Sequence, residues 1–359
     1  MLAILFLSIS HSVEGNKDGK IKGMFVFGSS LVDNGNNNFR PKSKSKANYL
    51  PYGVDFSSGP SGRFTNGKNV IDLLCDQLGL PLIPPFSDPT TKGNKILNGV
   101  NFASGSSGIL DETGSIAVEV ITLNQQIRNF EEVTMPELKA LQGKKKKSEE
   151  LLAKYMFVVG TGGNDYSFNY FLKPPNSSVS LQFFTDNLAD SLSKQPQKLY
   201  NIGGRKFVLM SVNPIGCYPY VITNLKSPNN TCIEALNNAA ELFNARLKST
   251  VDATKQQMPA SHFVFVNSYK IIADIIQNPV SQGFNNTSNN CCEVGSVNEE
   301  GNGILCEKEG KVCDERRTHV FFDGLHPTEA VNILIASKAF NSTLTTEAYP
   351  INVQQLAKN

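Results

Sequence analysis

Residues 24–38 read MFVFGSSLVDNGNNN, and this stretch decides the fold of the chain. Its first four residues form a continuous apolar run, which is typical of a buried parallel strand, and the run stops at Gly28. Glycine and small hydroxyl residues after a strand indicate a tight turn at the carboxyl edge of a sheet, where open α/β sheets bind their ligands. Ser30 is therefore the candidate nucleophile, although an ordinary polar turn explains this stretch alone equally well.

The size and composition of the chain indicate a globular protein. The sequence has 359 residues, of which 40% are hydrophobic and 18% are charged, so it can bury a large core in one or two domains. A net charge of +2 gives no sign of a nucleic-acid partner. The basic run at residues 144–147 has no interleaved aromatic residues, so we interpret it as a solvated loop.

The first residues predict export from the cell. Residues 2–9 (LAILFLSI) are apolar but too few to span a bilayer, and residues 1–15 resemble a secretory signal peptide. We expect no transmembrane segment in the mature chain. Five Asn-x-Ser/Thr sequons are candidate glycosylation sites: Asn176, Asn229, Asn285, Asn286 and Asn341. The sequence therefore predicts a secreted, extracellular glycoprotein.

The cysteines are consistent with an oxidising compartment. Six of the seven are disulfide candidates: Cys217, Cys232, Cys291, Cys292, Cys306 and Cys313. Cys291 and Cys292 are adjacent and cannot easily bond each other, so we expect each to reach one of the last two. Cys75 lies in an apolar helical pattern and is expected to be a buried free thiol. A zinc site is the competing interpretation of the last four cysteines, but the paired C-x2-C knuckles of structural zinc are absent.

Apolar runs alternate with helical patterns along the whole chain. After the opening run, strands are predicted at residues 100–103, 155–159, 206–210 and 262–266. Helices are predicted at residues 69–78, 119–132, 180–201, 233–257 and 327–340. Buried strands that alternate with long helices predict a parallel sheet between two helical layers. No repeat or long linker interrupts the pattern, so we expect one domain over residues 22–350, with loop insertions.

Glycine- and serine-rich loops follow two more of the predicted strands. These loops are residues 104–108 (SGSSG) and 160–165 (GTGGND), and in a parallel sheet they meet at the edge that holds Ser30. The phosphate-loop pattern G-x-x-x-x-G-K-[ST] is absent, and no glycine run fits the dinucleotide fingerprint. The sequence therefore implies no nucleotide cofactor.

The four histidines can be compared one by one as candidate bases. His11 lies near the expected cleavage site, His262 opens a predicted strand, and His319 lies beside an apolar extension. His326 differs because Asp323 precedes it by three residues in the segment DGLHPTE. The carboxylate can hold Nδ1–H of the imidazole and leave Nε2 free to take a proton from a serine. Asp-x-x-His alone is also found in turns and metal sites, but a serine at a strand end favours a catalytic triad.

Several motifs in order resemble the GDSL (SGNH) hydrolases, and specifically their plant esterase/lipase branch. FVFGSSLVDNGNNN is similar to the nucleophile block and SGRFTNGKNVIDLL to the segment after it. GVNFASGSSGI and FVVGTGGNDY are similar to the second and third blocks, VNPIGCYP to a plant-type loop, and FDGLHPTEA to the closing block. The resemblance covers about residues 22–340 and implies a three-layer α/β/α, flavodoxin-like fold with about five parallel strands.

The resemblance also implies a role for each site residue. Ser30 is the expected nucleophile, His326 the base and Asp323 its orienting acid. The Ser30 amide, the Gly105 amide and the Asn164 side chain are the expected oxyanion donors. In one place the chain departs from the family: Ser29 stands where the family has aspartate, which bears on catalytic efficiency more than on reaction class.

The function expected from these features is hydrolysis of carboxylic esters through an acyl-serine intermediate, with no metal or cofactor. The partner is then a small-molecule or polymer-bound ester, such as a lipid, acyl or acetyl ester. The G-x-S-x-G elbow of ordinary α/β-hydrolases is absent. Two alternatives stay open: an acyltransferase that uses the same acyl-enzyme, and a catalytically weak ester- or carbohydrate-binding protein.

Overall fold

A computed structural model describes residues 21–143, 147–171, 179–295 and 303–359. Its main sheet has six strands in the order β2-β1-β3-β4-β5-β8. The strands are β1 (Gly23–Gly28), β2 (Gly99–Asn101), β3 (Tyr155–Gly160), β4 (Lys206–Met210), β5 (His262–Val266) and β8 (Ala348–Tyr349). The first five are parallel, in the order of flavodoxin-like folds, which confirms the prediction. The antiparallel edge strand β8 was not predicted.

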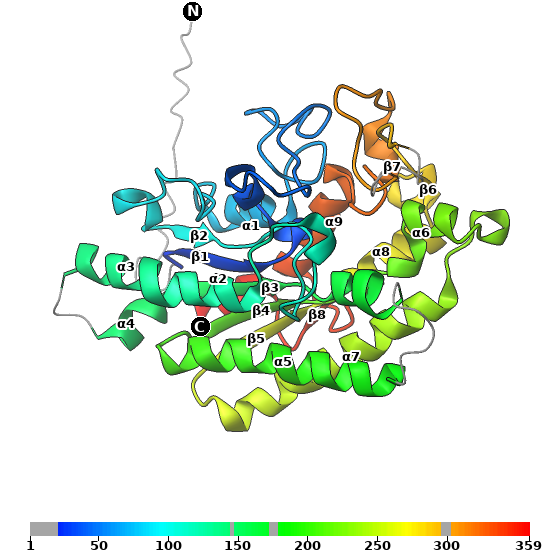
Figure 1. Cartoon of the computed structure of the whole chain (residues 1–359). Coiled ribbons are helices and arrows are strands. Elements are labelled where there is room, and N and C mark those ends of the chain that lie inside the picture. The colour runs from blue at the N-terminus through cyan, green and yellow to red at the C-terminus, as the bar shows by residue number, and fades with distance from the viewer. Residues whose placement is uncertain (1–20, 144–146, 172–178, 296–302) are drawn as a thin grey trace, which may run out of the picture.

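Helices cover both faces of this sheet. The long ones are α1 (Val70–Leu78), α5 (Leu181–Asn201), α7 (Glu234–Gln257), α8 (Ser268–Gln277) and α9 (Glu329–Asn341). The short ones are α2 (Leu123–Asn129), α3 (Met135–Leu141), α4 (Ser148–Leu152), α6 (Pro219–Asn224) and α10 (Val353–Lys358). In Figure 1 the sheet lies between α1 and α9 on one side and α5 and α7 on the other. The three-layer prediction is confirmed.

The strands form where they do because their side chains are buried on both faces. All six residues of β1 are buried, and Phe25 of β1 lies opposite Phe157 of β3 in register. Phe27 stacks on Phe102, with ring centroids 5.1 Å apart. Full burial of one such ring contributes about 1.5–3 kcal/mol. Burial of apolar surface therefore stabilises β1, the strand that precedes the candidate nucleophile.

Helix α1 begins at a capping box. The Asn69 side chain accepts hydrogen bonds from two amides of the first turn, and the Asp72 carboxylate accepts one from the Asn69 amide. Asp72 also forms a buried two-pronged ion pair with Arg63, at 2.6 and 2.8 Å. Removing one partner of such a pair typically costs about 3–5 kcal/mol. These contacts fix the segment between β1 and α1.

Three disulfides are present, as predicted, and Cys75 is a buried free thiol. They join Cys217 to Cys232, Cys291 to Cys313, and Cys292 to Cys306. The last two bonds enclose the segment beside a small second sheet, β6 (Asn286–Asn290) paired with β7 (His319–Phe321).

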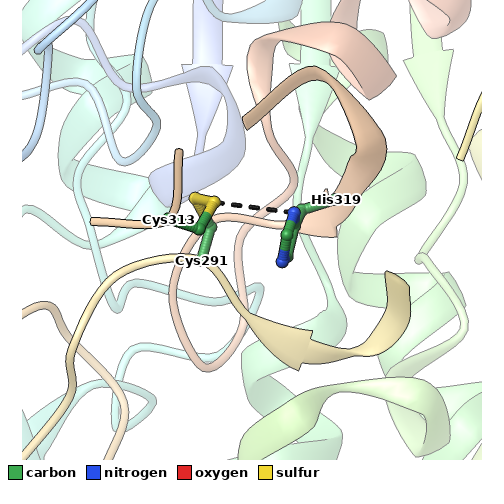
Figure 2. A group of neighbouring side chains, drawn as sticks. All are labelled: Cys291, Cys313 and His319. Carbon is green, nitrogen blue, oxygen red and sulfur yellow. Dashed lines mark hydrogen bonds between the residues drawn. A yellow bond between two sulfur atoms is a disulfide. The ribbon is translucent and has the colours of Figure 1, made fainter. Parts of the chain in front are cut away.

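The zinc alternative is not compatible with this pairing. Cys291, Cys313 and His319 place ligand-type atoms within 4.8 Å of one another, but both sulfurs belong to one disulfide (Figure 2). The thiolate, rather than a disulfide sulfur, is the zinc ligand of cysteine. His319 instead lies with Nδ1 3.5 Å from Cys313 Sγ.

Some predictions fall outside the described residues. These are the signal peptide at residues 1–15, the Asn176 sequon, and residues 144–146 of the basic run. Among the helices of the described ranges, none has the length and hydropathy needed to cross a bilayer.

Candidate active site

Ser30 lies just after the carboxyl end of β1, an interior strand of the main sheet. Gly28 ends that strand at φ 142°, and a Cβ there would lie 2.1 Å from the Gly160 carbonyl oxygen, so only glycine fits. The Ser29 amide donates to the same carbonyl at 3.0 Å. Ser30 then opens the short 3₁₀ helix Ser30–Val32, so its N–H takes no part in that helix's hydrogen bonding. The close backbone approach at Gly28 and the hydrogen bond of the Ser29 amide therefore fix the conformation of this turn.

The structure brings Ser30, His326 and Asp323 together. His326 Nε2 lies 2.8 Å from Ser30 Oγ, and His326 Nδ1 lies 2.7 Å from Asp323 Oδ2. Ser30 is 8% exposed, His326 4% and Asp323 fully buried. Asp323 Oδ1 also accepts hydrogen bonds from the amides of Leu325 and His326, at 2.9 and 2.7 Å. The carboxylate therefore orients both the turn and the imidazole.

The three predicted loops meet at this edge of the sheet. The Ser104 amide and the Ser107 hydroxyl both donate to the Gly28 carbonyl, at 3.0 and 2.9 Å. Asn164, after β3, donates from Nδ2 to the Ser107 carbonyl at 2.9 Å. A carboxamide NH₂ has two N–H donors, so one of them is left for another partner. Asn164 and Ser30 line the same two hollows.

The amide of Gly105, an expected oxyanion donor, contacts Asp33. It donates to Asp33 Oδ2 at 2.9 Å, so in this structure that N–H is directed at a carboxylate. Asp33 Oδ1 accepts from the amides of Gly35 and Asn36, at 2.7 and 2.9 Å. Sequence reasoning missed Asp33, although an aspartate three residues after the nucleophile within VDNGNNN was the available signal.

Two buried carboxylates, those of Asp33 and Asp165, accept hydrogen bonds from the loops around Ser30. Burial raises the pKa of Asp33 to about 6, because loss of solvation outweighs its three amide hydrogen bonds. Burial likewise raises the pKa of Asp165 to about 6. Asp165 accepts from the amides of Ile109 and Leu110 and from the Thr113 hydroxyl, at 2.8, 3.0 and 2.7 Å. These carboxylates tie the loop after β2 to those after β1 and β3.

A further residue, Tyr52, contacts the triad and was missed. Its hydroxyl donates to Asp323 Oδ2 at 2.6 Å and accepts from the Cys306 amide at 3.0 Å. Burial, followed by the charge of Asp323, raises the pKa of Tyr52 well above its ordinary value, so the hydroxyl keeps its proton. No local pattern could have found it, because 271 residues separate it from Asp323.

The other histidines lie elsewhere. His262 is exposed at the start of β5, at the opposite edge of the sheet from Ser30. His319 lies beside the Cys291–Cys313 disulfide. The Phe64 ring packs against His326, with ring centroids 4.9 Å apart. Among the histidines in the described part of the chain, only His326 contacts Ser30.

Comparison with known proteins agrees with this geometry. A family model described as GDSL-like lipase/acylhydrolase matches residues 24–339. The chain belongs to this family. An Arabidopsis thaliana GDSL esterase/lipase is 43% identical over 343 residues, which cover 93% of this chain and 87% of the relative. Two others from Arabidopsis thaliana are 38% identical over 352 residues (96% and 94% covered) and 40% identical over 343 residues (94% and 91% covered). This GDSL-like hydrolase is thus a carboxylic ester hydrolase with plant relatives.

Proposed function

We propose that this hydrolase cleaves carboxylic esters through an acyl-serine intermediate on Ser30. The supporting observation is the 2.8 Å contact between Ser30 Oγ and His326 Nε2, with Asp323 on the other ring nitrogen. Ser30 Oγ attacks the carbonyl carbon while its proton passes to His326. The C–O bond to the alcohol then breaks, and the imidazolium returns the proton to the departing oxygen.

Water completes the reaction by the reverse sequence. His326 takes a proton from the water, the water oxygen bonds to the acyl carbon, and the bond to Ser30 Oγ breaks with return of the proton. Asp323 holds the imidazole in the correct tautomer throughout. We assign the oxyanion hole to the Ser30 amide and the Asn164 side chain. The Gly105 amide joins them only if it releases Asp33.

The test is the substitution Ser30→Ala, because the proposed chemistry has no other nucleophile. Activity on a short-chain ester should fall at least about 1000-fold, and labelling by a fluorophosphonate probe should disappear. Retention of more than about a tenth of wild-type activity contradicts the assignment.

The binding-protein alternative depends on Ser29. An aspartate there could accept charge-assisted hydrogen bonds, which are worth about 1–2 kcal/mol more than those of a hydroxyl in a partly buried site. We expect the natural protein to be active, and Ser29→Asp to change kcat/KM by less than about thirtyfold. An inert natural protein that Ser29→Asp activates would support the binding role instead.

The acyltransferase alternative shares every step up to the acyl-enzyme. It differs in the second nucleophile, which is an alcohol rather than water. Product analysis with added alcohol acceptors separates the two: free acid as the main product supports the hydrolase, and a new ester as the main product supports the transferase.

We also propose that the protein is secreted and glycosylated. Three described sequons, Asn229, Asn285 and Asn341, are exposed, whereas Asn286 is half-buried in β6. The three disulfides agree with an oxidising compartment. Mass spectrometry of protein from a secretory host should find a mature start beyond about residue 10 and glycans on exposed sequons. A retained amino terminus without any glycan would contradict this proposal.

A further inference from the structure

Two hollows of very different size meet at Ser30. The smaller, which we call the chamber, has a volume of about 40 Å³, and the larger, which we call the groove, about 620 Å³. Four residues line both: Ser30, Asn164, Leu325 and His326. An ester bound at Ser30 therefore has one small space and one large space for its two ends.

The chamber lies at the carboxyl edge of the sheet and is less open to solvent than the groove. Its apolar walls include Val70 of α1, Met210 of β4 and Ile335 of α9, all of which are buried. One water needs roughly 10–15 Å³ of such space, so the chamber holds only about three groups of that size. An acyl group of two or three carbons fits this space.

Part of the chamber wall is a polar network. The Ser268 hydroxyl donates to Asn213 Oδ1 at 2.7 Å and lies 3.0 Å from the Ser211 hydroxyl. Thr161 also lines the chamber, and its buried hydroxyl has no hydrogen-bond partner among the described residues. A longer alkyl chain would have to break this network and bury polar groups against apolar ones, which is unfavourable. Lengthening the chamber would therefore cost free energy.

The groove is open and lined largely by side chains at the surface. Its lining includes the exposed Ile116 and Lys308, together with the partly exposed rings of Tyr49 and Phe168. Its volume is many times that of the chamber. A bulky alcohol can contact these side chains without entering the core.

The order of product release decides which end of the ester lies in which space. The alcohol must leave before water attacks, while the acyl group stays attached to Ser30. An alcohol in the chamber would have to pass the acyl group on Ser30, where the two hollows meet, whereas one in the more open groove can leave directly. The acyl group therefore belongs in the chamber and the alcohol in the groove.

We propose that this hydrolase selects acyl groups of two or three carbons, carried by bulky alcohols. This inference rests on the proposed function of Ser30. It makes the chamber walls, rather than the triad, the determinants of acyl length. Enlarging the chamber should lengthen the preferred acyl chain without removing the chemistry.

The experiment uses 4-nitrophenyl esters of acetate, propionate, butyrate, hexanoate and octanoate with the full mature chain. For the natural protein, kcat/KM should fall at least about tenfold from propionate to octanoate. In Met210→Ala, which enlarges the chamber, the octanoate-to-acetate ratio of kcat/KM should rise at least about tenfold. Met258→Ala is the matched control, because Met258 is equally buried in the core and lines neither hollow.

A second variant keeps the test decisive if Met210→Ala does not fold. Val70→Ala removes less volume from the chamber wall and should shift the same ratio in the same direction. Equal rates for acetate and octanoate in the natural protein, or unchanged ratios in the folded chamber variants, overturn the inference but leave the esterase intact. Absence of hydrolysis of every ester, together with no fluorophosphonate labelling of Ser30, overturns the proposed function and this inference with it.

Discussion

Ser30 and His326 lie 2.8 Å apart, yet different kinds of structure hold them. Ser30 follows β1, which pairs with parallel strands on both sides, and hydrogen bonds from neighbouring loops fix its turn. His326 lies in an irregular loop between β7 and α9, beside the segment that two disulfides enclose. We call the first region, residues 28–36 with the loops after β2 and β3, the nucleophile half. The second, Tyr52 with residues 291–295 and 303–328, is the base half.

The base half lies outside the main sheet and is held by disulfide bonds, the short strand β7 and a few long-range contacts. The Cys292 amide donates to the Phe322 carbonyl at 2.8 Å, and the Gly324 amide donates to the Ile304 carbonyl at 2.8 Å. Both contacts flank Asp323 in the chain. One serine–histidine contact therefore joins a strand end, which is held by the core, to a loop, which is held by disulfides. Substitutions in the two halves should therefore affect activity and stability differently.

The largest effect should come from the histidine at the junction of the halves. His326→Ala removes the base and should lower kcat/KM at least about 1000-fold, whereas His262→Ala should stay within about twofold of the natural protein. Steady-state kinetics on one short-chain ester measures both. Equal losses in two folded variants would mean that His326 is not the base.

Removal of a disulfide should distinguish the base half from the rest of the molecule. The Cys292–Cys306 and Cys217–Cys232 bonds have similar sequence separations, 14 and 15, so each should stabilise the fold by about 3 kcal/mol. Only the first is next to the amide that donates to Tyr52. Paired Cys→Ala variants should both melt earlier in calorimetry. At a temperature where both are folded, only Cys292→Ala/Cys306→Ala should lose activity, by more than about tenfold.

Equal activity in these two variants would show that the disulfides stabilise the fold without positioning the base. Equal loss in both would show that general loosening, rather than the link to Tyr52, lowers the rate.

Tyr52 offers a smaller and more local change within the base half. Tyr52→Phe removes the hydrogen bond to Asp323 and should lower kcat/KM about tenfold with KM within about twofold, because hydrogen bonds to charged groups are worth about 1.5–3 kcal/mol. Tyr155→Phe is the control, because that hydroxyl donates to the Leu97 carbonyl at 2.8 Å and Tyr155 lines neither hollow. A Tyr52→Phe enzyme with only lower stability would make Tyr52 structural.

The smallest effect concerns Asp33 in the nucleophile half and depends on pH. Its pKa is about 6 in the fold against an ordinary value of 3.8, so the folded protein binds this proton more tightly than the unfolded chain. The stability that Asp33 contributes is therefore greatest below about pH 4 and is lost as pH rises through about 6. Relative to Asp33→Asn, the natural protein should lose about 1 kcal/mol per pH unit in this window. Denaturant unfolding at several pH values measures the difference, and a flat difference would contradict the prediction.

The sequence alone predicted much of this molecule, because the decisive signals are local. The apolar runs predicted the five parallel strands of the main sheet, since burial on both faces requires consecutive apolar residues. Asp323 and His326 were recognisable because they share one turn, and Ser30 because it follows the strand that ends at Gly28. The six paired cysteines were predicted because four of them are clustered, Cys217 and Cys232 flank one loop, and the seventh, Cys75, lies in an apolar helical pattern.

Only the tertiary structure determines which segments far apart in the chain contact one another. The contact between Tyr52 and Asp323, the amide of Gly105 on Asp33, and the strand β8 depend on residues far apart in the chain. The chamber and the groove are likewise spaces between elements, bounded by β4, α1 and α9 on one side and by surface loops on the other. The periodicity of a sequence indicates which residues are buried. Which buried residues contact one another depends on the packing of distant segments, and this packing cannot be derived from local sequence patterns.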